Sequence, residues 1–307
     1  MITSLLDLIS TPMPVLNSLG LNLKVGLSSD DPVAGRSPSE SYEAYLSIYS
    51  PRGELLERQH LGQIPPNRRR LFDISAISRK LVPSENHLVV AHRIPSRLAP
   101  EIERIEDPVE IKEERDYSMF RGLVEYSFPE GGNGSVIYET PPRLNAGTRK
   151  GSSNTLSFTS QTVLSDLVKS YMVLIHYSVN PSYDSSATFG YTFNSFDGEI
   201  AHSDTVTIAP FGIHVLDVGS LIPANIIQRE KDQGDGLAAF NFVGYSEDAS
   251  FMVLIFNVTP SIGSVALEHT HPAQSYLFPG RLDHRRDLKS TAQGAWKRIL
   301  SAIGDGR

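Results

Sequence analysis

The feature that most constrains the fold is a pattern of strands and turns that occurs twice in the chain. Residues 45–73 and 191–217 each show an alternating apolar strand, a glycine turn, a second strand that ends at proline, and a third that closes on an apolar–aspartate pair. The equivalent positions lie 144 or 145 residues apart. They are Gly53 and Gly198, Pro66 and Pro210, and Asp73 and Asp217. The near-constant spacing predicts a tandem duplication of one β-domain.

The distribution of turns predicts an all-β fold made of two tandem sandwiches. Short apolar runs, many of them β-branched, alternate with Gly, Pro, Asn and Asp turns, and strands do not alternate with long helices. This arrangement is typical of a β-sandwich. A chain of 307 residues is also longer than a single core usually serves. We therefore expect each copy to enclose its own core, and the copies to pack about a pseudo-twofold axis or to present two similar edges to partners.

Composition changes along the chain predict five segments. They are an N-terminal arm at 1–19, a first sandwich at 20–145, a linker at 146–154, a second sandwich at 155–284 and a C-terminal helix at 285–307. The linker is assigned because it is rich in Gly, Ser and basic residues, which favour an extended and solvated chain.

The repeat is expected to extend beyond the hairpin. Residues 123–129 align with residues 266–272 at a spacing of 143. Residues 228–236 are polar and end in glycines, and we interpret them as the tip of a hairpin.

The last segment differs in character from the rest. Apolar residues recur at three- and four-residue spacings from Leu288 onward, and the only tryptophan, Trp296, lies on the same face. This pattern predicts an amphipathic helix. It packs on its own domain or, alternatively, docks on a partner or on a membrane surface.

Charge and cysteine content narrow the class of protein. The formal net charge of −7 and the pI near 5.7 argue against a nucleic-acid-coating protein. The absence of cysteine removes disulfides, thiolate metal sites and cysteine nucleophiles, and it fits a cytoplasmic protein. No export signal is evident at the N-terminus, and no apolar run is long enough to span a bilayer, so we expect no transmembrane segment.

The Glu-His-Thr-His segment that ends at His271 is the best candidate for a metal site. In one extended strand, His269 and His271 would face the same side and bind one divalent cation, with His284 as a third ligand. A His-x-His pair also begins the metal motif of cupins, but the glutamate that should follow it is missing. The aligned residues of the first copy are aromatic, Tyr126 and Phe128, which instead favours packing positions on a half-buried strand.

Other catalytic patterns are missing. The sequence has no nucleophile elbow and no phosphate-binding glycine loop, so we predict no catalytic residues. The basic run Arg68, Arg69 and Arg70 is a candidate contact for a phosphate or a sugar acid, although such runs more often form solvated loops.

Parts of each copy resemble the small β-sandwich domain of the sensory rhodopsin transducer family. The resemblance is carried by the turn Pro66–Arg70, the pair Phe72–Asp73, the loop that begins at Pro83, and the strand Glu268–Thr270, which is Glu125–Ser127 in the first copy. It covers about half of each unit. The resemblance implies a non-enzymatic, oligomeric, cytoplasmic domain that binds a protein partner or a small ligand.

These observations favour a non-catalytic binding or scaffold protein, with a protein partner or self-association expected and Arg68, Arg69, Arg70 and Trp296 as contact residues. A metal-dependent, cupin-like enzyme that uses His269 and His271 is one alternative. A carbohydrate-binding module is the other. The first hypothesis needs no cofactor, whereas the cupin-like alternative needs a divalent metal.

Overall fold

The structure is a computed structural model that describes most of the 307-residue chain. The described residues are 2–4, 10–29, 41–101, 108–110, 123–137, 155–177, 184–246, 249, 251–269, 271–272, 294, 297 and 301. The predicted linker at 146–154 lies outside them, as do Trp296 and His284. Of the predicted C-terminal helix, only Gly294, Lys297 and Ser301 are described, and all three have helical backbone.

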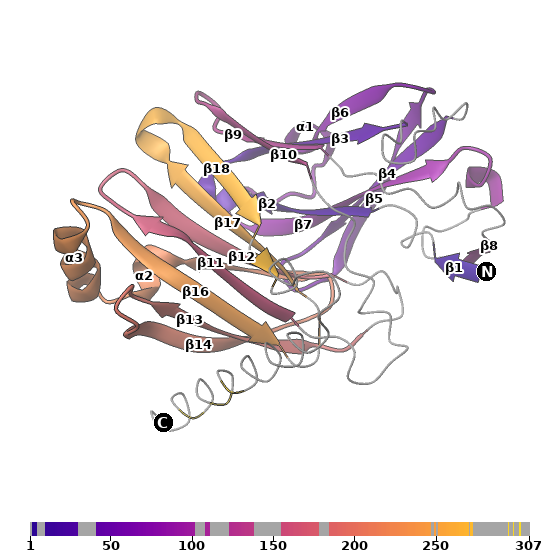
Figure 1. Ribbon diagram of the computed structural model, residues 1–307. Coiled ribbons are helices and arrows are strands. Elements are labelled where there is room, and N and C mark those ends of the chain that lie inside the picture. The colour runs from indigo at the N-terminus through magenta and orange to yellow at the C-terminus, as the bar shows by residue number, and fades with distance from the viewer. Residues whose placement is uncertain are drawn as a thin grey trace, which may run out of the picture.

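The chain is mostly β, and four antiparallel sheets pair into two sandwich-like bodies (Figure 1). The first half contains β1 (Ile2–Ser4), β2 (Ser10–Leu16), β3 (Asn22–Ser28), β4 (Tyr42–Tyr49), β5 (Leu55–Ile64), β6 (Arg69–Asp73), α1 (Ile74–Ile77), β7 (Asn86–Pro95), β8 (Pro108–Glu110), β9 (Leu123–Ser127) and β10 (Asn133–Ile137). The second half contains β11 (Thr155–Leu164), β12 (Lys169–His176), β13 (Ala187–Asn194), β14 (Ile200–Ile208), β15 (Gly212–Asp217), α2 (Val218–Leu221), α3 (Ala224–Gln233), β16 (Ala238–Ser246), β17 (Met252–Thr259), β18 (Ser264–His269) and β19 (His271–Pro272). Three short 3-10 helices are Asn17–Leu19, Ala99–Glu101 and Pro260–Ile262.

We number the four large sheets in the order in which they pack. Sheet 1 has the order β10-β9-β3-β6 and sheet 2 the order β2-β7-β4-β5. Sheet 3 has the order β15-β12-β17-β18 and sheet 4 the order β14-β13-β16-β11-β19. Sheets 1 and 2 form the first sandwich, and sheets 3 and 4 form the second. The pair β1 and β8 makes a separate two-stranded sheet.

The two sandwiches repeat one strand order. The order in sheet 1 matches that in sheet 3, and the order in sheet 2 matches that in sheet 4 apart from the additional edge strand β19. The strands β2–β7, β9 and β10 therefore correspond to β11–β16, β17 and β18. The predicted alignment of 123–129 with 266–272 pairs β9 with β18 and is therefore wrong by one strand. That alignment rested on a short Glu-polar motif, whereas the position of a strand in a sheet is set by its hydrogen-bonded neighbours.

Local geometry repeats as well. Asp73 accepts a hydrogen bond from the Ala76 amide at the start of α1, and Asp217 accepts from the amides of Gly219 and Ser220 at the start of α2. Each aspartate therefore caps the short helix that follows the third strand of the repeated pattern.

Two predicted details differ from the structure. Residues 10–16 of the expected N-terminal arm form β2, which pairs with β7 inside sheet 2, so the strands of the first sandwich begin ahead of residue 20. The predicted hairpin tip at 228–236 is wrong, because α3 occupies most of it. Pro223 before the helix and Gly234 after it are ordinary helix boundary residues, and the segment between them is rich in good helix formers.

Sheet 3 is buried on both faces, which departs from the expectation that each sandwich encloses a separate core. Met172, Leu174 and Ile255 point toward sheet 4 and belong to the core of the second sandwich. Val173, Leu254 and other alternating residues of the same strands belong to a cluster that also contains the core of the first sandwich. Because successive side chains of a strand point to opposite faces, the strands of sheet 3 contribute side chains to both cores.

The sandwiches meet in two places. The equivalent strands β10 and β18 lie beside each other, and their turns approach closely at Gly131 and Gly263. The second contact joins non-equivalent faces. The Phe211 ring, before β15 of sheet 3, stacks on Tyr49 of sheet 2 with ring centroids 4.9 Å apart. The Ile213 amide donates to the Pro51 carbonyl over 3.0 Å. Sheet 3 therefore packs on the outer face of sheet 2, and in the first sandwich the equivalent of sheet 3 is sheet 1. A pseudo-twofold axis would join equivalent faces, so the contact at Phe211 departs from the predicted pseudo-twofold relation, whereas the contact of β10 with β18 joins equivalent strands as that relation requires.

Candidate functional site

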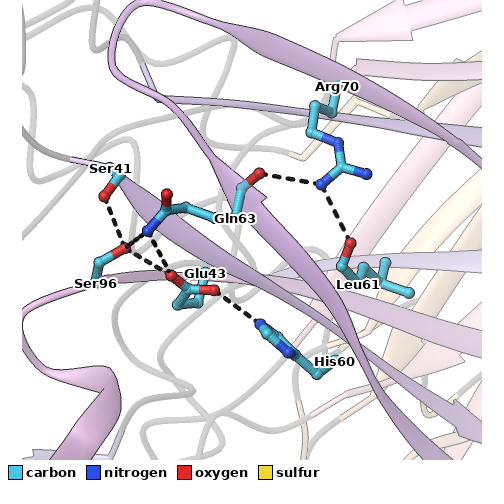
Figure 2. Close-up of polar contacts among 7 residues, drawn as sticks. All are labelled: Ser41, Glu43, His60, Leu61, Gln63, Arg70 and Ser96. Carbon is cyan, nitrogen blue, oxygen red and sulfur yellow. Dashed lines mark hydrogen bonds and ion pairs between the residues drawn. The ribbon is translucent and has the colours of Figure 1, made fainter.

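A polar cluster lies on the outer face of sheet 2, at the end where β4 and β5 extend away from Tyr49 (Figure 2). It consists of Glu43 and Tyr45 on β4, His60 and Gln63 on β5, and Ser96 after β7. The same face carries the contact with sheet 3, so the cluster lies at the rim of that contact.

A β-bulge brings these side chains together. Gly62 pairs with Ala44 and His60 pairs with Tyr45, which leaves Leu61 as an extra residue on β5. Gly62 has a φ of 89°, which a residue with a side chain adopts only under strain. In a regular strand, residues three apart face opposite sides. The extra residue turns His60 to the side on which Gln63 already lies.

The Glu43 carboxylate is the centre of the cluster. Its Oε2 lies 2.8 Å from His60 Nε2. Its Oε1 accepts from Gln63 Nε2 at 3.0 Å and from Ser96 Oγ at 2.9 Å, and Ser41 Oγ donates to Ser96 Oγ at 3.0 Å. Figure 2 shows these contacts as a chain of dashed lines that converge on the carboxylate.

These donors determine the charge of Glu43. Burial raises the pKa of the carboxyl, but the hydrogen bonds from His60, Ser96 and Gln63 lower it more, and the net pKa lies below its ordinary value. The Glu43 side chain is 14% exposed, whereas that of His60 is 52% exposed. A ligand that approaches from solvent would therefore meet the His60 side chain before the Glu43 carboxylate.

The aromatic member of the cluster is Tyr45. Its ring centroid lies 4.8 Å from that of the His60 imidazole, with the planes tilted by 34°. Burial, and then the charge of Glu43, raise the pKa of the Tyr45 phenol, so the hydroxyl stays protonated at neutral pH. The cluster thus offers an imidazole, an amide, a hydroxyl and a flat ring from adjacent strands.

The geometry of the cluster differs from that of a nucleophilic triad. In such a triad the imidazole lies between the hydroxyl and the carboxylate. Here the carboxylate lies between them, because Ser96 and His60 bind opposite oxygens of Glu43. The imidazole is hydrogen-bonded to the carboxylate and not to Ser96, so the described contacts do not connect this serine to a general base.

A second Ser–His contact on the same face is buried. Ser47 Oγ lies 3.3 Å from His92 Nε2, and both residues are at most 1% exposed. Burial, and then the charge of Arg58, lower the pKa of His92 to about 3. A neutral imidazole beneath sheet 3 is a packing residue without access to a substrate.

Of the three arginines predicted as contact residues, Arg70 reaches the edge of sheet 2. Arg68 is in the turn before β6, and Arg69 and Arg70 begin the strand; all three are exposed. Arg70 Nη1 donates to the carbonyls of Leu61 and Gln63 at 3.2 and 3.0 Å. Its guanidinium also lies over the Phe72 ring, 4.9 Å from the centroid, so Arg70 already has a structural role.

The predicted metal ligands belong to different strands. His269 ends β18 in sheet 3, and His271 begins β19 in sheet 4. The two residues therefore do not share one extended strand, which was the premise of the prediction. Among the residues that the structure describes, no group of three His, Asp or Glu side chains is arranged to hold a metal ion. His284 and Trp296 lie outside the described residues.

Sequence spacing alone did not find the Glu43 cluster, since its members come from three strands and meet through a bulge. One signal was available: an isolated glycine inside a strand pattern, here Gly62, often marks a bulge that re-aims neighbouring side chains.

Comparison with known proteins finds distant structural likeness only. No family model matches the chain. No curated protein matches it either. Among solved structures, a β-glucuronidase from glycoside hydrolase family 2 is 7% identical, with a TM-score of 0.20, and the match covers 85% of this chain and 23% of that one. A putative β-galactosidase from Bacteroides fragilis is 8% identical, with a TM-score of 0.19 and coverage of 89% and 35%. A β-glucuronidase from Ruminococcus gnavus is 11% identical, with a TM-score of 0.19 and coverage of 86% and 36%.

The chain spans about a quarter to a third of the length of these three glycosidases. At such TM-scores the likeness carries no argument about activity or substrate. In the part of the chain that the structure describes, no helix is long and apolar enough to span a membrane.

Proposed function

We propose that the chain is a non-catalytic binding protein that takes a small polar ligand at the Glu43 cluster. The observation that carries this proposal is the arrangement around the carboxylate, where fixed donors hold both oxygens of Glu43 and none of these contacts activates the serine. His60 and the Tyr45 ring flank this carboxylate, and His60 is the exposed member. Such a preorganised polar surface binds a ligand without reorganising itself.

The ligand class that suits this surface is a compound rich in hydroxyl groups, such as a carbohydrate. A sugar presents donors and acceptors around a ring with an apolar face. The carboxylate and the Gln63 amide supply both kinds of hydrogen bond, and the Tyr45 ring supplies a flat apolar contact.

The Glu43 cluster lies on one of two similar sandwiches. We propose that the two sandwiches arose by internal duplication, and the repeated strand order and the repeated aspartate caps support this. The proposal of a non-enzymatic binding domain also agrees with what the resemblance to the sensory rhodopsin transducer family implies.

The test is a glycan array followed by calorimetric titration of the full chain. We expect saturable binding of at least one glycan, weakened at least tenfold by His60→Ala and by Gln63→Ala. Thr188→Ala is the matched control, because Thr188 is the residue of β13 that corresponds to Glu43, and we expect it to leave binding unchanged. Unaltered affinity in both cluster variants, or chemical turnover of the bound glycan, would overturn the proposal.

A further inference from the structure

A cavity of about 290 Å³ lies at one end of the second sandwich. Its walls come from the turn between β11 and β12, from the short helix α2 and from the longer helix α3, which lies at the same end of the sandwich (Figure 1). Lys169 and Ser220 line the cavity and are exposed, so solvent reaches it. Small-molecule sites begin at roughly 300 Å³, so this volume suits a small ligand.

The cavity depends on a helix that only the second sandwich has at this place. In the first sandwich, the turn between β2 and β3 is hydrogen-bonded directly to the segment between α1 and β7, where Asn17 Nδ2 donates to the Val82 carbonyl at 2.9 Å. In the second sandwich α3 takes the place of that segment, and the turn between β11 and β12 contacts it through the ion pair of Asp166 with Lys231. The cavity is thus an addition to the repeated architecture.

Two lysines line the cavity. Lys231, on α3, has a side chain that is 18% exposed, and its ammonium donates to Asp166 Oδ1 at 2.8 Å. An ammonium carries three donors, so Lys231 can bind a further acceptor. Lys169, at the start of β12, forms no ion pair within the described part of the chain. The cavity therefore offers two cationic groups to a ligand.

The carboxylate in the lining is already hydrogen-bonded. Asp217 Oδ1 accepts from the amides of Gly219 and Ser220, and its Oδ2 accepts from Ser220 Oγ at 2.9 Å. Both oxygens are therefore used at the start of α2. The charges of Asp217 and Asp166 nevertheless balance those of the two lysines, so a singly charged anion suits the cavity better than a doubly charged phosphate.

We propose that this cavity binds a small organic acid as its carboxylate anion, with the charged head against Lys169 and Lys231. The lining also includes the apolar side chains of Leu164, Val168 and Ile227. These three residues provide a contact for a short alkyl chain, whose apolar surface is removed from water on binding. The site belongs to the second sandwich and is independent of the Glu43 cluster.

The test is calorimetric titration of the full chain with hexanoate. We expect saturable binding that weakens as the salt concentration rises, because salt screens the charge of the exposed Lys169. Hexanol has the alkyl chain without the charge, and inorganic phosphate has the charge without the alkyl chain. Both should bind at least about tenfold more weakly than hexanoate.

Three substitutions test the charged part of the site. Lys231→Met keeps a long side chain without its charge, and it should weaken hexanoate binding at least about tenfold, since a hydrogen bond to a charged group contributes this much. Asp166→Asn removes the carboxylate that shares Lys231 and should tighten binding at least about twofold. Lys80→Met is the matched control with no expected effect, because Lys80 is an exposed lysine in the segment of the first sandwich that α3 replaces.

Lys169→Met covers the case in which Lys231→Met fails to fold, because Lys169 is exposed, and it should weaken hexanoate binding at least about threefold. His60→Ala should leave hexanoate binding unchanged, which separates this site from the glycan site proposed at Glu43. Absence of hexanoate binding, equally tight binding of hexanol, or equal affinity in the Lys80→Met variant and the folded variants of the two cavity lysines would overturn the proposal.

Discussion

Phe211 combines an unfavourable backbone with the main aromatic contact between the sandwiches. Its φ is 61°, in the left-handed region that residues with a bulky side chain avoid. The corresponding residue of the first sandwich is Asn67, at φ 55°, and asparagine tolerates this region. The Phe211 ring stacks on Tyr49 and meets Tyr177 edge-on at 5.6 Å. Ring packing therefore offsets a strain of about 1–2 kcal/mol.

Substitution of Phe211 should separate these two effects. We expect Phe211→Ala to lower the free energy of unfolding by about 3 kcal/mol, because it loses the ring and keeps the strained backbone. Phe211→Asn should cost about 1 kcal/mol less, since asparagine suits the left-handed region. Urea denaturation measures both values. Equal losses in the two variants would show that strain at this position is negligible.

His92 should make the stability fall in mild acid. Above pH 6.5 its imidazole is neutral in both the folded and the unfolded chain. As the pH falls toward 3, the unfolded chain binds a proton that the buried His92, with its pKa lowered to about 3, does not bind. We expect a loss of about 2 kcal/mol from this residue between pH 7.5 and pH 5.

The control for this pH dependence is His92→Gln, which keeps a polar side chain opposite Ser47 and removes the titration. Its stability should fall by about 2 kcal/mol less over the same pH interval, measured by urea denaturation at each pH. A pH profile identical to that of the unsubstituted chain would assign the acid sensitivity to other groups.

At the scale of the element, the turns between strands decide how the sandwiches meet. Gly53 and Gly198 occupy equivalent turns with φ of 86° and 91°. A Cβ on Gly53 would come within 1.9 Å of the Pro210 carbonyl of the second sandwich, whereas a Cβ on Gly198 would meet nothing within 4 Å. The same hairpin turn is therefore a docking contact in one copy and free of such contact in the other.

The pair of glycines provides a matched experiment. Both Gly53→Ala and Gly198→Ala should lower stability by about 1 kcal/mol through the positive φ. In addition to this shared cost, Gly53→Ala should lower the free energy of unfolding by at least about 2 kcal/mol, because the new methyl group collides with the backbone at Pro210. Thermal and urea unfolding of both variants measure the difference, and equal costs would argue against the contact at Pro210.

The Arg70 cap on β5 predicts a change in solubility. Arg70→Ala frees the carbonyls of Leu61 and Gln63 on an edge strand, and we expect aggregation to begin at a lower temperature in light scattering. The control is Arg69→Ala, which removes the same charge from the neighbouring exposed position. Identical onset temperatures in the two variants would contradict a capping role.

At the scale of the whole molecule, sheet 3 couples the two sandwiches. Leu254 and Ile255 are neighbours on β17, fully buried in different clusters. We expect a single calorimetric transition, with equal calorimetric and van't Hoff enthalpies, that shifts to lower temperature in both Leu254→Ala and Ile255→Ala. Two separate transitions, each sensitive to only one variant, would show that the sandwiches unfold independently.

The repeat of glycine, proline and aspartate predicted the sandwich architecture because these residues mark turns and caps, which are set locally. The packing of sheet 3 was not predictable, since the alternation of Val173 and Leu174 does not say what covers each face. The Glu43 cluster depends on a one-residue bulge at Leu61. One extra residue in a strand does not alter the composition of the segment, so composition gave no sign of it. The two histidines near the end of β18 looked like one motif because spacing alone does not reveal that the chain changes sheets between them.

The two sandwiches meet through two different kinds of contact. Phe211 and Ile213 of the second sandwich contact Tyr49 and Pro51 of the first, which are not their equivalents, whereas the equivalent strands β10 and β18 lie beside each other. The opposite face of sheet 1 carries the ion pair of Lys24 with Glu125, and the opposite face of sheet 4 carries Thr188 and Thr207 joined through their hydroxyls. The proposed duplication thus gave each unit the same strand order, but sheet 3, unlike its equivalent sheet 1, acquired apolar side chains that are buried on both of its faces.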